Sequence, residues 1–290
     1  MFPLYTTHFP SSASDLEGLL NQSLQRLFTA TAGESVTVRD KSFPDLKEIR
    51  VSLDGARLPD NPARPTLICG NASPALWVDQ LTISAFPLAI GPAGLNLTLS
   101  ARNATFVQGT DSDQELALAF QNAADGRLEV SITQADLAAL VTQIAREQAG
   151  KQNITVEAIE VELWQNNEHS LTAQIRIQIR KLFVSASLNI TGRLDLNDEL
   201  NLRVSNLNCS GQGTGAQIAC GFLNPYLRRI ENREFPLMVL PMGEIHLRDV
   251  RVAVNERITV TAEFGSGTGS GSGSGSAGLP SSPSARGSVL

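Results

Sequence analysis

The amino-acid sequence predicts an α+β protein in which long antiparallel strands dominate and amphipathic helices separate groups of strands. The clearest observation is a two-residue hydrophobic period from Leu171 to Ile179, where aliphatic residues alternate with Thr, Gln and Arg. The same alternation returns in residues 182–190, 200–204 and 258–264. Such a period places apolar side chains on one sheet face and polar side chains on the other. What the apolar face covers is therefore the functional question.

Length and charge restrict the class of protein. The chain has 290 residues, of which 42% are hydrophobic and 18% charged, as expected for a globular protein with a sizeable core. Its formal net charge of -6 argues against a nucleic-acid partner, because binding to phosphates requires a basic surface.

The sequence gives few indications of the cellular compartment. No apolar run approaches the roughly 20 residues that span a bilayer, and Met1–Tyr5 lacks the basic start and apolar stretch of a secretory signal. We expect a cytoplasmic protein, or a mature form whose signal was removed, with peripheral membrane contact as an option. Reduced thiols are favoured for the three cysteines. A bridge between Cys209 and Cys220, which flank a glycine-rich loop, is the alternative for an exported protein.

The first half of the chain begins with a polar lead, residues 1–13. The capping pattern Ser14-Asp15-Leu16-Glu17 and a following leucine stripe predict an amphipathic helix over residues 14–30. Strands are then predicted at residues 36–39, 49–58, 76–85, 95–107, 116–120 and 128–132.

The second half opens with a helix that starts at the capping pattern of Thr133 and ends near Gly150. Strands follow at residues 154–164, 171–196, 200–208, 244–254 and 257–264, and a third helix at residues 216–232. Short polar turns predict antiparallel hairpins. A change of phase near Arg180 predicts a bulge or bend within residues 171–196. We expect residues 14–264 to form one domain and residues 265–290, rich in Gly and Ser, to form a flexible tail.

Catalytic motifs are weak in this chain. Gly211-x-Gly213-x-x-Ala216 matches a dinucleotide fingerprint, but it follows a hairpin instead of opening a parallel strand-helix-strand unit. The histidines show no metal-ligand spacing. Glu160 and Glu162 share a strand face and suit either a glycosidase pair or a solvated face, the simpler interpretation. We therefore expect no enzyme activity, catalytic residue, metal or cofactor.

A cluster of arginines follows in the third helix. Arg228, Arg229 and Arg233 either complement the negative end of the helix dipole or contact an anionic headgroup.

Four segments carry a resemblance to a known family. They are Leu27-Phe28-Thr29 with Glu34–Val38, Ser42–Ile49, Ser131–Leu137, and Phe222-Leu223-Asn224-Pro225-Tyr226-Leu227. With the order of helices and strands over residues 14–264, they resemble the tubular lipid-binding superfamily. Within it, the chain is similar to a bacterial and plastid family of unknown function that includes an actinobacterial phosphatidylinositol-binding protein of mannoglycan elongation.

The resemblance implies a highly curved antiparallel sheet wrapped around long amphipathic helices, with an elongated tunnel for a phospholipid or similar apolar ligand. It implies binding, or transfer, without covalent chemistry. The candidate tunnel residues are Ile175, Ile177, Ile179, Val184, Leu202, Phe222 and Tyr226, and the candidate headgroup residues are Arg228 and Arg229. The alternative is a structural or interaction module with the same sheet packed solid.

Overall fold

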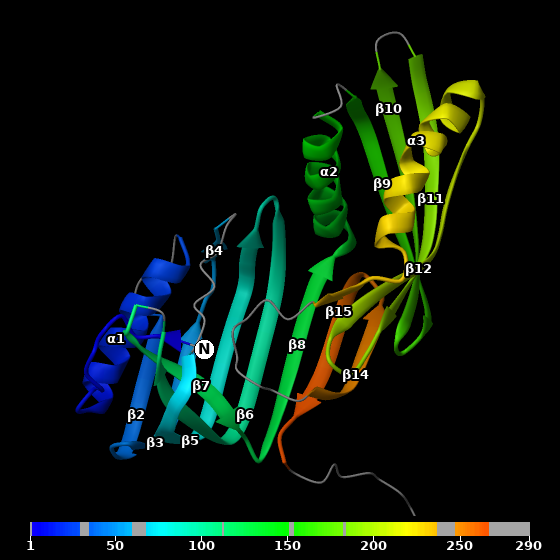
Figure 1. Cartoon of the computed structure of the whole chain (residues 1–290). Coiled ribbons are helices and arrows are strands. Elements are labelled where there is room, and N and C mark those ends of the chain that lie inside the picture. Colours follow the sequence, from blue (N-terminus) through cyan, green and yellow to red (C-terminus); the bar gives the residue numbers. More distant parts are fainter. Residues whose placement is uncertain are drawn as a thin grey trace, which may run out of the picture.

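The computed structural model describes residues 2–29, 35–59, 68–111, 113–150, 154–181, 184–236 and 247–266. Strands dominate these residues and helices punctuate them, which confirms the α+β class. The strands form two sheets that give the molecule an elongated outline (Figure 1). The predicted strand residue His246 and the tail from residue 267 lie outside the described residues.

The first sheet has ten strands, and its central path runs β14-β15-β8-β6-β5-β3-β2. Its members are β1 (Phe2–Pro3), β2 (Val36–Ser42), β3 (Asp45–Ser52), β4 (Arg57–Leu58), β5 (Ile68–Ile90), β6 (Ala93–Thr110), β7 (Leu116–Asn122), β8 (Asp125–Thr133), β14 (Leu247–Val254) and β15 (Arg257–Phe264). The sheet curls, as expected for long twisted strands (Figure 1). It is antiparallel except where β3 and β4 pair with β5 in parallel, so the fully antiparallel prediction was wrong at that point.

The second sheet has five strands in the antiparallel order β13-β12-β11-β10-β9. They are β9 (Thr155–Asn167), β10 (Ser170–Lys181), β11 (Val184–Leu196), β12 (Asn201–Gly211) and β13 (Glu234–Pro236). The irregularity predicted near Arg180 is present, because the register of β10 with β9 shifts between Gln178 and Ile179. Residues 171–196 nevertheless form two strands and not one, because β10 ends at Lys181, which pairs with Val184 of the antiparallel β11. The reversal itself produces the change of phase.

The helices are α1 (Ala13–Leu27), α2 (Gln134–Gly150) and α3 (Thr214–Ile230). Each has 15 or 17 residues, so they are shorter than the long helices of the expected architecture. Thr133 caps α2 as predicted, with its hydroxyl accepting from the Asp136 N–H at 3.0 Å. The cap of α1 is Ser12, not Ser14, because the Asp15 N–H donates to the Ser12 hydroxyl at 3.1 Å.

α1 covers the edge strand of the first sheet. The Glu17 carboxylate accepts from the Val38 N–H at 2.7 Å, and the Asn21 side-chain oxygen accepts from the N–H groups of Ser35 and Val36. These bonds occupy groups that an open edge would offer to another chain. Leu16, Leu20 and Leu24 meanwhile enter the main core, which lies between α1 and the curled sheet.

The two sheets meet where β9 turns into β10. The Val252 N–H of β14 donates to the Glu168 carbonyl at 2.6 Å. The Gln165 side chain donates to the Val252 carbonyl at 3.0 Å and accepts from the Val254 N–H at 3.2 Å. Leu171, Leu196 and Leu200 of the second half belong to the main core. The division into one domain over residues 14–264 stays a prediction.

Candidate functional site

One face of the second sheet is lined almost entirely by apolar side chains, and we call it the apolar face. Directly paired residues of neighbouring strands share a face. Ile175 pairs with Val161 on β9 and with Ile190 on β11, and Ile190 pairs with Cys209 on β12. Following the register, the apolar face comprises Val156, Ile159, Val161, Leu163, Leu171, Ala173, Ile175, Ile177, Ile179, Ala186, Leu188, Ile190, Leu194, Leu196, Leu202, Val204 and Cys209.

The two ends of the apolar face pack against different clusters. At the end near the first sheet, Leu171 and Leu196 are buried in the main core. At the far end, Leu188 is buried with Ala216 and Cys220 of α3, and Ile177 and Ile179 pack against this smaller cluster. Both ends are thus covered by the protein's own side chains.

The middle of the apolar face is covered less completely. Val161, Ile175 and Ile190 form one row across three strands, are only half-buried, and belong to neither cluster. A half-buried aliphatic row keeps part of its surface in water, at a cost of about 25 cal/mol per Å² of exposed apolar area. The row can therefore gain from additional apolar cover.

The two helices of the second half contact different strands of the sheet. α2 contacts β9, whereas α3 contacts β11 and β12 (Figure 1). α2 contains no fully buried residue among those whose side chains are described, although its aliphatic stripe was predicted to face a core. Leu137 packs against the main core, but Ile144 is 51% exposed. The second half thus carries more apolar surface than its own helices cover.

The glycines before α3 have a structural role. A Cβ on Gly211 would lie 2.6 Å from the Ala216 Cβ and 2.6 Å from the Ser187 carbonyl oxygen, so only glycine allows α3 to approach the sheet here. Gly213, the N-cap residue, has φ +86°, which also favours glycine. β12 pairs antiparallel with both neighbours, which supports the sequence argument against a dinucleotide site.

A disulfide fixes α3 to the sheet. Cys209 of β12 is bonded to Cys220 of α3, so the prediction of reduced thiols was wrong for this pair. The reason is geometric: the glycine loop reverses the chain and brings the two Cα atoms to 5.6 Å, within the range for a bridge.

The candidate ligand residues fall into three groups. Ile175, Ile177, Ile179 and Leu202 lie half-buried on the apolar face, with Leu202 at the end nearer the first sheet. Tyr226 is 57% exposed on α3 and belongs to neither cluster. The side chains of Val184 and Phe222 lie outside those described. Sequence reasoning missed Val161 and Ile190, although both lie on predicted strands with the same alternation.

The candidate headgroup residues lie on the surface. Arg228 and Arg229 are exposed in the last turn of α3. The Arg229 guanidinium carbon lies 5.7 Å from the centre of the Tyr226 ring, within cation–π distance.

The opposite face of the second sheet is polar and paired. Arg176 donates to Glu160 and to Glu162, each with an ion-pair distance of 3.0 Å. Arg180 pairs with Glu157 at 3.2 Å. This pattern supports a solvated strand face, because exposed carboxylates paired with arginines of the neighbouring strand are typical of such a face.

Titratable groups with shifted pKa values have structural explanations. The pKa of Asp136 lies below its usual value because the Thr133 hydroxyl and the Gly94 N–H donate to its carboxylate. Burial raises the pKa of Tyr5, against the opposing effect of Arg26. No group of three or more His, Cys, Asp or Glu residues suited to a metal occurs in the described parts of the chain.

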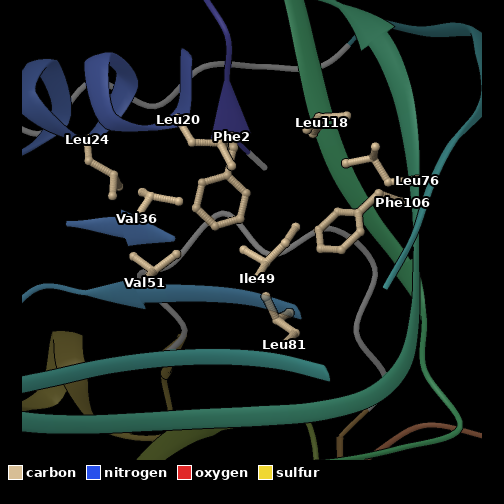
Figure 2. A pocket seen from close by; sticks show the side chains of 10 residues that line it. All are labelled: Phe2, Leu20, Leu24, Val36, Ile49, Val51, Leu76, Leu81, Phe106 and Leu118. Atoms are coloured by element: carbon tan, nitrogen blue, oxygen red, sulfur yellow. The ribbon is translucent and has the colours of Figure 1, made fainter. Parts of the chain in front are cut away.

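A cavity lies in the main core between α1 and the first sheet (Figure 2). Its volume is about 10 Å³, about the space of one water molecule. In Figure 2 the ring of Phe2 lies between the α1 leucines and Ile49. Drug-sized ligands occupy about 300 Å³ or more, so this cavity holds no acyl chain as it stands.

Comparisons with known proteins gave no relative. No protein-family model, no curated protein and no solved structure matches the chain. Among the described helices, none is long and apolar enough to cross a membrane.

Proposed function

We propose that the protein binds a phospholipid or a similar long apolar ligand, without covalent chemistry, on the apolar face of the second sheet. The observation that carries the proposal is the half-buried row Val161, Ile175 and Ile190, which lies between two packed clusters and joins neither. The row crosses three neighbouring strands, which lie about 4.8 Å apart, so a segment of an acyl chain laid along the row crosses the sheet. The resemblance of residues 14–264 to the tubular lipid-binding superfamily agrees with this site, and membership stays part of the proposal.

Apolar burial would supply the binding free energy. An acyl chain laid along the row contributes about 25 cal/mol per Å² of its own surface removed from water, plus a similar amount for the protein surface that it covers. The polar end of the ligand would remain near the exposed rim, where α3 carries Arg228 and Arg229. Guanidinium groups suit phosphate because they form paired hydrogen bonds.

Lipid extraction tests the proposal directly. The full chain, purified without detergent, is extracted with organic solvent and its lipids are identified by mass spectrometry. In parallel, the protein is titrated with a fluorescent fatty acid. We expect a co-purifying lipid or saturable uptake at about one ligand per chain. Absence of both would overturn the proposal.

A matched pair of variants localises the ligand. Ala173→Trp adds bulk on the apolar face between Leu163 and Gly192, next to the half-buried row. Thr172→Trp adds the same bulk to the adjacent residue, which points to the polar face. We expect at least a tenfold loss of ligand affinity for Ala173→Trp and little change for Thr172→Trp. Equal effects of the two variants would place the ligand elsewhere.

The alternative is an interaction module with a solidly packed core. The first sheet favours it, because the cavity in its core has a volume of about 10 Å³ and is too small for an acyl chain. Under this alternative no lipid co-purifies and the parent chain takes up no fatty acid. Ala173→Trp then changes only the free energy of unfolding, which it lowers.

A further inference from the structure

α3 carries apolar side chains on its solvent side. Ile218 and Tyr226 are each 57% exposed, and Ile230, in the last turn, is 38% exposed. At 3.6 residues per turn, spacings of eight and four residues spread the three side chains over about 120° of the helix surface, with Tyr226 between the other two. Phe235 of β13, just beyond the helix, is also 38% exposed. We call these four residues the α3 stripe.

The inward side of α3 faces away from Ile218, whereas Ile230 follows Leu223 by two turns and lies beyond the buried cluster. Ala216 and Cys220 are buried against the sheet, and Leu223 packs with them. The disulfide between Cys209 and Cys220 holds that side in place. The disulfide therefore fixes the orientation of α3, and the helix cannot rotate about its axis to bury the stripe unless the disulfide is broken.

Basic groups gather at the C-terminal end of the stripe. Arg228, Arg229 and Arg233 are exposed, and none has an ion-pair partner among the residues that the structure describes. Arg203 contacts Asn232 at 3.4 Å and adds a fourth cation. Glu231 and Glu234 are the acidic groups of the same segment. The region is thus locally positive on a chain whose formal net charge is -6.

We propose that α3 docks on an anionic lipid bilayer, with Ile218, Tyr226 and Ile230 inserted at the headgroup boundary and Arg228, Arg229 and Arg233 contacting phosphates. Helices that lie in a membrane interface combine a band of apolar side chains with Lys or Arg. The stripe is small: its three helical residues extend over about 18 Å along the helix axis, from Ile218 to Ile230, at 1.5 Å per residue. A stable protein partner requires a broader patch of about 800 Å² on each side.

The proposal goes beyond the proposed function, because it concerns a bilayer surface and holds whether or not the apolar face binds a ligand. The first test is co-sedimentation of the full chain with phosphatidylcholine vesicles, with and without phosphatidylglycerol. We expect binding only to the anionic vesicles, weakening as ionic strength rises. Absence of binding, or equal binding to neutral vesicles, would overturn it.

Charge variants identify the surface that docks. Arg228→Gln should weaken binding to anionic vesicles about fivefold, as expected for one cation near an anionic surface. Arg146→Gln removes the same charge from an exposed position on α2 and should change binding less than twofold. Equal losses would indicate a general charge effect and would overturn docking through α3.

A spectroscopic variant reports insertion. Tyr226→Trp adds a fluorophore within the stripe, and the parent chain, with Trp77 and Trp164, supplies the baseline. We expect a blue shift of the added emission on anionic vesicles. An unshifted emission, or a stripe-dependent self-association seen by gel filtration, would overturn bilayer docking. Lipid extraction is run on every variant, so that failure of ligand binding is distinguished from failure of docking.

Discussion

The two sheets differ in how completely helices cover them. In the first half, α1 inserts Leu16, Leu20 and Leu24 into a core in which many aliphatic residues are less than 5% exposed. In the second half, α2 and α3 lie against β9 and against β11 and β12, and the row of Val161, Ile175 and Ile190 stays half-buried. The two halves thus differ in how much of the apolar sheet face their own helices bury, and the proposal of a ligand on the second sheet rests on that difference.

Truncation of matched helix residues should show the difference most strongly. Leu16 of α1 is fully buried, whereas Ile144 of α2 is 51% exposed. Leu16→Ala should lower the free energy of unfolding by about 2–5 kcal/mol, because it leaves a cavity. Ile144→Ala should cost less than about 1 kcal/mol, since little packing is lost. Urea denaturation measures both, and equal costs would contradict the contrast between the two halves.

Loss of the disulfide should affect the second half selectively. The bridge closes a loop with a sequence separation of 11 residues, for which chain entropy predicts a loss of about 3 kcal/mol on removal. The double variant Cys209→Ser/Cys220→Ser should increase amide hydrogen exchange in α3 and leave exchange in α1 unchanged. Increased exchange in α1 as well would mean that the halves unfold together.

A glycine substitution tests the close packing of the first half. A Cβ on Gly126 would lie 2.2 Å from ring atoms of Phe264, which is 1% exposed. Gly126→Ala should therefore cost about 1–3 kcal/mol in unfolding free energy. The control is Gly221→Ala in α3, where no atom lies within 4 Å of the added Cβ and helix propensity favours alanine by about 1 kcal/mol. Calorimetry should show a lower Tm for Gly126→Ala and a higher Tm for Gly221→Ala than for the parent chain.

Acid should weaken the attachment of α2 slightly. The pKa of Asp136 is lower in the folded state than in the unfolded chain, owing to the bonds from Thr133 and Gly94. Its contribution is therefore fully present above about pH 4 and is lost as pH falls through the folded-state pKa. The unfolding free energy of Asp136→Asn should depend less on pH between about pH 5 and pH 2 than that of the parent chain. If the unfolding free energies of the variant and the parent chain changed equally with pH, Asp136 would not be the cause of the acid dependence.

Local signals in the sequence predicted local structure well. Thr133 and Asp136 identify the start of α2 because a cap depends only on residues three positions apart. The alternation in residues 171–179 likewise predicted the apolar face of β10. Ser12 and Ser14 are both suitable N-cap residues for α1, and the prediction chose Ser14, whereas Ser12 is the cap. The reversal after Lys181 was missed because Leu182-Phe183 lacks the Gly, Asn or Asp typical of tight turns.

Features that depend on distant residues could not be predicted in the same way. The parallel pairing of β3 with β5 requires a crossover through residues 53–67, which alternation does not reveal. The disulfide depends on how the Gly211–Gly213 loop turns the chain toward the sheet. The incomplete cover of Val161 and Ile190 depends on where two helices lie, and a hydrophobic period reports a face without reporting what covers it.

The position of β15 has a consequence for synthesis. β15 lies between β8 and β14, so residues 257–264 form an inner strand of the first sheet. The first strand of that sheet, β1, begins at Phe2. The whole second sheet, residues 155–236, leaves the ribosome before that strand. Chains emerge at roughly 5–20 residues per second, so β8 waits several seconds with one edge unpaired. During that interval the nascent chain exposes a strand edge that is paired with β15 in the folded protein, and an unpaired edge is a site for aggregation.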